Sequence, residues 1–295
     1  MRVFAIGATG VLGRYLIPLL LRGGHEVTVM SPGGRLDTLP DGVRRVRAGL
    51  LDPDTPERLR ALLDDADVVV NTATAIPRDF AARGAWQENT RLRREGTLVV
   101  AEAVLAAGTP ALVQMSVTMA YPDGGDRWLD EDEELDTCPT RAVVAAPVAA
   151  MEATVRALPT DRVAWTILRG ARFVGPGTGQ DQLRRQLREG TLRGPCGGRE
   201  FVSMVHVADF AAAVVAVVEN PRPGAVFNIA DEPLRIAHYL SGLAAFDGCP
   251  PPPATAEAPL DVVSHRVSST AARVELGWWP AHGIWPLRDL DPEKT

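Results

Sequence analysis

The sequence predicts an α/β fold built on a doubly wound parallel sheet. Short apolar segments alternate with longer segments of helical periodicity from the first residues to about residue 170. Such alternation is typical of parallel strands joined by right-handed helical crossovers. The chain also opens on an apolar segment, residues 3–6, that leads into three glycines at spacing three. We expect the first strand, a tight turn and the first helix at these positions.

The glycine segment predicts a phosphate-binding turn. A helix N-terminus offers free N–H groups and a partial positive charge, which suit a pyrophosphate. In such a turn Gly7 permits the bend, Gly10 lets the backbone approach a phosphate, and Gly13 lets helix and strand pack closely. Because the three glycines follow a strand and precede a helix, we expect a bound dinucleotide here.

Strands and helices are expected along the whole chain, with looser alternation after the sixth strand. In the first part, strands are expected at 3–6, 25–30, 43–48, 67–71, 111–115 and 163–168, and helices at 55–64, 85–107 and 141–158. Later strands are expected at 201–206 and 225–229, and later helices at 207–219, 233–246 and 269–276. We predict a dinucleotide-binding Rossmann domain over 1–170. Residues 171–295 are expected to form mostly a small C-terminal substrate-binding lobe, with some segments returning to the first domain.

The composition narrows the classes of partner. The 295 residues carry a net charge of −6 without a basic block, so a nucleic-acid partner is not expected. No apolar run reaches membrane-spanning length and the first strand begins at once, so we expect neither a membrane segment nor a signal peptide. Three scattered cysteines indicate a reducing, cytoplasmic setting without a structural metal. The acidic run 130–134 is expected to be solvated surface.

Several short motifs occur in an order that is known from one family. They are GATGVLG at 7–13, GLLD at 49–52, Asn89 with EGT at 95–97, Leu168-Arg169 followed by GPG at 175–177, FVSMVHVAD at 201–209, and ELGW at 275–278 with Pro280. With them the chain resembles the extended and atypical branch of the short-chain dehydrogenase/reductases, the NAD-dependent epimerase/dehydratase-like group. The resemblance implies a Rossmann fold, a nicotinamide dinucleotide and a small-molecule substrate. Members often pair through their long helices, so a homodimer is one expected assembly.

The end of the second strand indicates which nucleotide binds. NAD use needs a carboxylate for the ribose 2′-hydroxyl, whereas this segment offers Ser31 and Arg35. Because arginine binds a phosphate bidentately, we predict NADP(H) rather than NAD(H), unless Arg35 is only a solvated loop residue. Asp52 is expected at the adenine, or as an N-cap of the next helix. The expected cofactor contacts are Gly7, Thr9, Gly10, Val11, Leu12, Gly13, Ser31, Arg35, Leu51, Asp52, Thr72 and Ala73.

The catalytic pair that the resemblance implies is missing from its expected place. The family uses a tyrosine and a lysine four residues apart on the helix after the fifth strand, where the lysine lowers the tyrosine pKa. Aligned on Glu152, those positions fall on Val144 and Val148. None of the three tyrosines lies in this helix, and the single lysine is Lys294. A standard tyrosine–lysine mechanism is therefore excluded.

Three hydroxyl groups after the fifth strand are the candidate catalytic groups: Ser116, Thr118 and Tyr121. Ser116 or Thr118 is expected either to reach a substrate or to satisfy the backbone at the strand end. Tyr121 is expected as a proton donor or as a structural residue, and without a cationic neighbour its pKa should stay near about 10. Two arginines are further candidates, Arg78 as a substrate contact or a solvated residue, and Arg172 near the nicotinamide or the substrate.

Two functions fit these residues. The first is an NADP(H)-binding enzyme that acts on a small, largely apolar metabolite in secondary-metabolite biosynthesis, since Val144 and Val148 would make the substrate cavity apolar. Its reaction would be a reduction, or a non-redox isomerisation, dehydration or cyclisation. The second is a non-catalytic NADP(H) sensor that binds a partner protein. The retained motifs of the C-terminal lobe favour the enzyme.

Overall fold

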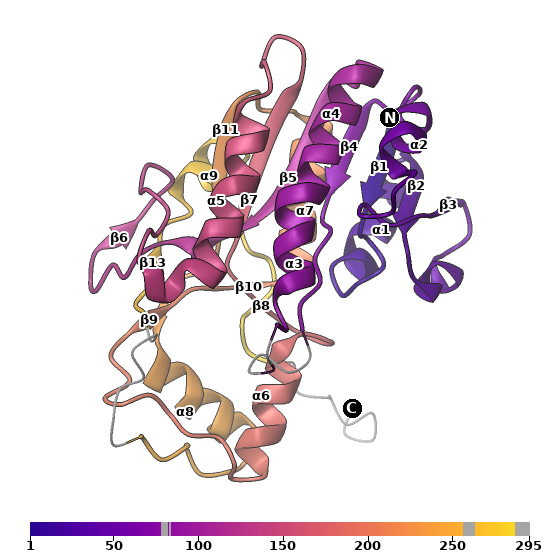
Figure 1. Cartoon of the computed structure of the whole chain (residues 1–295). Coiled ribbons are helices and arrows are strands. Elements are labelled where there is room, and N and C mark those ends of the chain that lie inside the picture. Colours follow the sequence, from indigo (N-terminus) through magenta and orange to yellow (C-terminus); the bar gives the residue numbers. More distant parts are fainter. Residues whose placement is uncertain (78–81, 83, 256–262, 287–295) are drawn as a thin grey trace.

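A seven-stranded parallel sheet forms the centre of the molecule (Figure 1). The computed structural model describes residues 1–77, 82, 84–255 and 263–286. The strand order is β11-β7-β5-β4-β1-β2-β3. The strands are β1 (Arg2–Ile6), β2 (Glu26–Ser31), β3 (Val43–Arg47), β4 (Val68–Asn71), β5 (Ala111–Val117), β7 (Ala164–Gly170) and β11 (Ala225–Ile229). The order reverses between β1 and β4, and ligands bind at such a switch point. The predicted fold class is confirmed.

Helices cover both faces of the sheet, as the alternation of apolar residues requires. Along β1, Val3 and Ala5 belong to one apolar cluster, and Phe4 and Ile6 belong to the other. The first cluster includes residues from α1 (Gly13–Arg22), α7 (Val207–Glu219) and α9 (Thr270–Glu275). The second includes residues from α2 (Thr55–Leu62), α4 (Thr97–Ala107) and α5 (Ala142–Arg156). None of the helices within the described residues has the length and apolar character of a membrane span.

The predicted helix over 85–107 is interrupted. It consists of α3 (Gln87–Arg91), a π-helical turn η2 (Leu92–Gly96) and α4, and it ends at Gly108 in the left-handed conformation. A π-helical turn inserts one extra residue into the helix and is frequent at functional sites. Here the turn includes the buried Arg93, and Gly96 packs against Leu50, where an added Cβ would lie 3.3 Å from Leu50 Cδ1.

A smaller lobe lies beyond the carboxyl ends of the strands (Figure 1). It contains α6 (Gly179–Arg188) and α8 (Ile236–Phe246), which share an apolar core with Val174 and Met204. Its short sheets pair β8 (Arg172–Val174) with β10 (Met204–His206), and β9 (Phe201–Val202) with β12 (Leu234–Arg235). A further pair joins β6 (Trp128–Leu129) to β13 (Arg266–Val267). Although β11 and α7 follow residue 170, they pack in the main unit. The division at residue 170 stays a prediction.

Candidate active site

Each of the three glycines of the first turn has a distinct environment. Gly7 has a φ of +79°, and a Cβ there would lie 2.5 Å from Ala73 Cα, because the ends of β1 and β4 meet closely. A Cβ on Gly13 would lie 1.8 Å from the carbonyl oxygen of Ala8. A Cβ on Gly10, by contrast, would have no atom of the described residues within 4 Å apart from its own chain neighbours. Packing fixes the first and third glycines, while the second faces open space that a phosphate can enter.

The start of α1 leaves its backbone donors available. Leu12 is the N-cap residue and gives no side-chain cap, so the first N–H groups of the helix stay free for an anion. Leu12 is buried and Val11 packs against the same apolar cluster. Thr9 Oγ1 lies 3.0 Å from Ser31 Oγ, which ties the glycine turn to the end of β2. The residues present therefore fit a bound dinucleotide.

The loop after β2 presents a free cation. Arg35 is exposed in the 3-10 turn η1 (Gly34–Thr38), and its guanidinium has no hydrogen bond or ion pair within the described ranges. Its backbone is fixed, because the Arg35 carbonyl accepts a hydrogen bond of 2.8 Å from Thr38 Oγ1. Arg45 on β3 donates to the carbonyls of Leu36 and Leu39 and holds the turn in place.

Asp52, Thr72 and Ala73 each take part in a hydrogen bond that fixes the local backbone. Asp52 Oδ2 accepts a hydrogen bond of 2.7 Å from Gly49 N and closes the turn beside the half-buried Leu51. Asp52 is not the N-cap of α2, since that position is Asp54. Thr72 Oγ1 donates to the carbonyl of Ile6 at 2.9 Å, and Ala73 N donates to the side chain of Asn71. The Thr72 contact joins the end of β4 to β1.

Ser116 belongs to a buried ion-pair network rather than to open space. Its hydroxyl donates a hydrogen bond of 2.6 Å to Glu152 Oε1. Glu152 in turn accepts two hydrogen bonds from Arg169, at 2.9 and 2.7 Å, and all three side chains are buried. Burial raises the pKa of the Glu152 carboxyl, but its hydrogen bonds and ion pair with Arg169 outweigh burial and hold the pKa below the usual value. The carboxylate is therefore charged at neutral pH.

Tyr121 extends the same network. Its hydroxyl accepts a hydrogen bond of 2.6 Å from Arg169 Nη1 and lies 2.8 Å from the Asp130 carbonyl and 2.9 Å from Asn228 Oδ1. The expectation that Tyr121 lacks a cationic neighbour is wrong, because Arg169 is that neighbour. Burial nevertheless raises the pKa of the Tyr121 hydroxyl to about 12. These contacts favour a structural role for Tyr121.

Thr118 and the two valines lie on the apolar side of the site. Thr118 is buried in a short 3-10 turn after β5, and its hydroxyl has no hydrogen bond to any residue that the structure describes. Val148 is fully buried in a cluster with Ala120, Ala145 and Met151, and Val144 is half-buried one turn earlier on α5. A lysine at residue 148 would be enclosed by apolar side chains, and burying its charge without a partner would be costly. This part of α5 therefore suits apolar residues.

Two further arginines need comment. The sequence analysis did not single out Arg93, and it left two roles open for Arg172. Arg93 in η2 is buried, and burial lowers its pKa to about 10 although the Glu152 charge opposes the shift. No periodic signal marked it, because its position depends on the π-helical turn. Arg172 begins β8, just beyond the end of β7, and is exposed. Arg78 lies outside the described residues.

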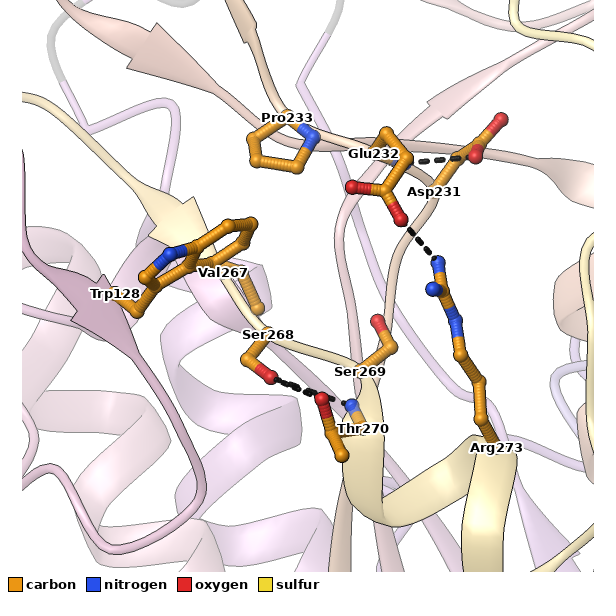
Figure 2. Close-up of a pocket in the computed structure, with 9 residues that line it drawn as sticks. All are labelled: Trp128, Asp231, Glu232, Pro233, Val267, Ser268, Ser269, Thr270 and Arg273. Carbon is orange, nitrogen blue, oxygen red and sulfur yellow. Dashed lines mark hydrogen bonds and ion pairs between the residues drawn. The ribbon is translucent and has the colours of Figure 1, made fainter.

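A separate pocket of about 230 Å³ lies on the β6/β13 pair and the start of α9 (Figure 2). Trp128 and Glu232 line opposite sides of it, and Arg273 donates to Glu232 at 2.8 Å (Figure 2). None of the predicted site residues lines this pocket. Among the described residues there is no group of three or more His, Cys, Asp or Glu side chains that could hold a metal ion.

The protein has a doubly wound sheet, a glycine turn at the switch point of that sheet, and a lobe beyond the strand ends. These features define a nucleotide-binding α/β protein of the Rossmann class. The model of one family, the NAD dependent epimerase/dehydratase family, matches residues 3–230, and the chain belongs to that family. The predicted resemblance is thereby confirmed, and with it the dependence on a nicotinamide dinucleotide that defines the family. The choice of NADP over NAD stays a prediction.

Two curated relatives and one solved structure are similar over almost the whole chain. The 3-diazoavenalumate denitrifying reductase of a Streptomyces species is 34% identical over 304 residues, which covers 97% of this chain and 98% of the relative. The dTDP-6-deoxy-L-talose 4-dehydrogenase (NAD(P)(+)) of Kitasatospora kifunensis is 28% identical over 308 residues, covering 95% and 91%. The structure of a dTDP-glucose 4,6-dehydratase from Streptomyces venezuelae with NAD superposes with a TM-score of 0.82 at 19% identity, covering 96% and 93%. At that identity the structure supports the fold alone.

Proposed function

We propose that this protein is an NADP(H)-dependent reductase of a small, largely apolar metabolite, and that its reaction needs no proton from the protein. The proposal rests on one observation: the groups expected to act as acid or base are either engaged in buried hydrogen bonds or replaced by apolar side chains. The hydroxyls of Ser116 and Tyr121 are held in a buried network with Glu152 and Arg169. Helix α5 presents apolar side chains where the resemblance expects the tyrosine and the lysine.

The chemistry of hydride acceptors separates two kinds of reduction. A carbonyl that accepts a hydride becomes an alkoxide and needs an acid to protonate it. A carbon that loses a leaving group needs no acid, because the leaving group takes the bonding electrons. The 34% identical relative is named a denitrifying reductase of a diazo compound. That name describes a reduction in which a leaving group departs. We therefore propose that this chain also replaces a diazo group by hydrogen.

A nicotinamide held beside the turn 7–13 would supply the hydride, so that R–N₂⁺ and NADPH would give R–H, N₂ and NADP⁺. The residues of the chain bind and orient the reactants. We propose that the turn 7–13 holds the pyrophosphate, that Ser31 and Arg35 hold the 2′-phosphate, and that Thr118 contacts the substrate. The half-buried Val144 is proposed to contribute an apolar wall that excludes water from the electrophilic carbon, and the fully buried Val148 is proposed to support the helix behind it. Ser116 and Tyr121 are proposed to position these groups through the network.

Isotope transfer tests the reaction. The purified protein is incubated with NADPH deuterated at C4 of the nicotinamide and with a set of aryl diazo compounds, and the products are analysed by mass spectrometry. We expect one deuterium at the carbon that has lost its nitrogen. A changed product without deuterium would contradict the proposal in favour of a non-redox isomerisation, dehydration or cyclisation. The absence of any product from these compounds and from ketone controls would favour the sensor.

The cofactor preference has its own test. An arginine–phosphate pair contributes about 1.5–3 kcal/mol, so we expect Arg35→Ala to weaken NADPH binding roughly 10- to 100-fold and to leave NADH binding unchanged. Arg44→Ala is the matched control, because Arg44 is an exposed arginine of the neighbouring strand β3. Titration calorimetry measures both. A wild-type protein that binds NAD as tightly as NADP would show that the argument from Arg35 is wrong.

A further inference from the structure

His206 fills a narrow space where two parts of the chain meet. It ends β10 and is the N-cap residue of α7. A Cβ on Gly175 would collide with Nε2 of the His206 ring, so the ring is packed against the loop that leads to α6. Tyr15 of α1 meets the ring in a T-shaped arrangement, with 6.0 Å between the two ring centroids. The His206 ring therefore contacts both the helix that follows the glycine turn and the loop at the start of the lobe.

His282 stacks on His206. The two ring centroids lie 4.7 Å apart, and the ring planes are inclined by only 14°. The buried carboxylate of Asp209, in the first turn of α7, fixes His282: it accepts the backbone N–H at 3.0 Å, and Nδ1 of the ring lies 2.7 Å from Oδ1. Ile284, two residues further on, belongs to the lobe core. The stack therefore joins α7 to the segment that enters the lobe.

The contacts of His206 require its neutral form. Nδ1 accepts a hydrogen bond of 3.2 Å from the backbone N–H of Ala208, and this bond caps α7. A ring nitrogen that accepts a hydrogen bond carries no proton, so protonation of Nδ1 removes the cap. It also places a positive charge at the N-terminus of α7, where the helix dipole disfavours cations. Uptake of a proton and the observed contacts of His206 are thus mutually exclusive.

The environment of the ring disfavours the same proton. Burial lowers the pKa of His206, the charge of His282 lowers it further, and the Asp209 carboxylate opposes both. That carboxylate is already bonded to His282, and among the described residues no carboxylate forms an ion pair with His206. A proton on His206 therefore has no compensating partner in the observed arrangement.

The other titratable side chains at this junction are a tyrosine and two groups at the next turn of the loop. Asp181 of α6 accepts a hydrogen bond of 2.7 Å from the N–H of Gly177, and a Cβ on Gly177 would lie 3.3 Å from Arg14 Nη1. Tyr15 is the titratable neighbour that α1 presents to the stack. Among the groups named, only the two histidines are of a type that titrates between about pH 5 and 8. A pH response of this junction in that range therefore comes from the stack.

We propose that the His206–His282 stack is a pH-sensitive latch that holds the lobe against the helices α1 and α7. While His206 is neutral, the latch fixes the loop at Gly175 and the segment at His282. A proton on His206 breaks the cap and the stack, and the lobe opens. Gly175 transmits the change, because its N–H donates to Gln180 Oε1 on α6 at 3.0 Å, and its carbonyl accepts from Thr178, the N-cap residue of α6. This inference concerns the movement of the lobe and does not depend on which reaction the site performs.

Amide hydrogen exchange of the full chain tests the latch. The opening equilibria of α6 and α8 are measured at pH 7.5 and 5.5 and corrected for the intrinsic pH dependence of exchange. A histidine that titrates at about pH 6.5 when the lobe is open limits the increase to about tenfold between these two values. We expect α6 and α8 to open several times more at pH 5.5, and to exchange faster than β1, β4 and β5 at both values.

Two variants and one titration identify the responsible group. His206→Asn keeps an N-cap acceptor but takes up no proton, so it should lose most of the pH response. His238→Asn is the matched control, because His238 is an exposed histidine of α8, and it should respond like the wild type. The imidazole NMR signals of the wild type should show that His206 titrates below about pH 6.5.

Three results would overturn the inference. They are an equal pH response in His206→Asn and the wild type, a His206 ring that titrates at or above about pH 6.5, and exchange in α6 and α8 that is no faster than in the strands of the sheet. The melting temperature of His206→Asn at pH 7.5 shows whether the variant is folded. If it is not, the exchange and the titration of the wild type decide.

Discussion

The chemistry of individual residues at the substrate end is dominated by one buried cation, Arg169. It bonds Glu152 on α5 through two nitrogens and Tyr121 through a third contact, and it has almost no contact with solvent. A buried charge of this kind is tolerated only with its partners in place. Because Glu152 also accepts the hydrogen bond of the Ser116 hydroxyl, the network joins the ends of β5 and β7 to α5. Ser116 and Tyr121, two of the expected catalytic groups, thus make contacts that are typical of structural residues.

Breaking this network should be costly. We expect Arg169→Met to lower the free energy of unfolding by roughly 3–5 kcal/mol, because it leaves the Glu152 carboxylate buried and unpaired. The double variant Glu152→Met with Arg169→Met should recover part of that loss. Arg156→Ala is the control, since Arg156 is half exposed and only 3.5 Å from Glu152, and it should cost less than about 1 kcal/mol. Urea unfolding measures all three. A small loss in Arg169→Met would show that the ion pair contributes little.

His265 should make stability depend on pH. Burial lowers its pKa to about 4, so the folded protein keeps it neutral where the unfolded chain, with a histidine pKa of about 6.5, takes up a proton. Stability is therefore expected to fall as the pH drops from about 6.5 to about 4, by at most about 1.4 kcal/mol per pH unit. Glu152, whose pKa is lowered, adds a further loss only below the unfolded value of about 4.3.

The variant His265→Gln separates the two effects. Glutamine keeps a donor for the Tyr121 carbonyl, which lies 2.9 Å from His265 Nε2, but it does not titrate. As the pH is lowered from 7 to 4.5, the melting temperature should fall less in the variant than in the wild type, even if the variant is less stable at pH 7. Parallel curves for the two proteins would assign the pH dependence to other groups.

At the scale of elements, the β1–turn–α1 unit combines packing constraints with an open position. Gly13→Ala places a Cβ against the Ala8 carbonyl, so we expect a loss of stability of several kcal/mol and a loss of cofactor binding. Gly10→Ala meets no described atom, so its melting temperature should stay close to that of the wild type while NADPH binding weakens at least about tenfold. Thermal unfolding and fluorescence titration measure the pair. If Gly10→Ala binds NADPH normally, the phosphate does not approach this residue.

How far the sequence predicts an element depends on where its determinants lie. Helix α7 and strand β11 match their expected ranges residue for residue, because local periodicity and flanking polar residues define them. The expected strand at 201–206 is divided at Ser203, whose hydroxyl donates to the His265 carbonyl and accepts from Val267 N. Those partners are more than 60 residues away, so no local pattern could reveal the break.

In the candidate site, too, features set by local sequence were predictable and features set by distant contacts were not. The glycine turn was predictable, because its three glycines report a local conformation. The contacts of Arg169 were not, since its partners Tyr121 and Glu152 lie 48 and 17 residues away and meet it only through the strand order. The burial of Arg93 goes with its place in the π-helical turn Leu92–Gly96, which no periodic pattern in the sequence marks. Sequence therefore predicts the nucleotide side of the site better than the substrate side.

At the scale of the whole molecule, one C-terminal segment connects the main unit to the lobe. Trp278 is buried in the core of the main unit, and its indole N–H donates to the Asp209 carbonyl at 2.9 Å. His282 donates its backbone N–H to Asp209 Oδ2 at 3.0 Å, and its ring nitrogen Nδ1 lies 2.7 Å from Oδ1. Two residues later, Ile284 is buried in the lobe core, where its carbonyl accepts from Gln180 on α6. Asp209 on α7 is therefore the anchor of this segment.

Removing the anchor should loosen the lobe without unfolding the sheet. Asp209→Ala leaves two donors of His282 unpaired, and we expect amide hydrogen exchange in α6 and α8 to accelerate by roughly tenfold, as for a loss of about 1.4 kcal/mol or more. Exchange in β1, β4 and β5 should not change. Glu219→Ala is the matched control on the same helix, because Glu219 is exposed and, among the described residues, its carboxylate pairs with the ring of His25 alone, at 3.5 Å. Mass spectrometry of exchanged peptides measures both variants. Equal acceleration in the sheet and the lobe would mean that Asp209 stabilises the whole fold, and that the segment does not couple the lobe selectively.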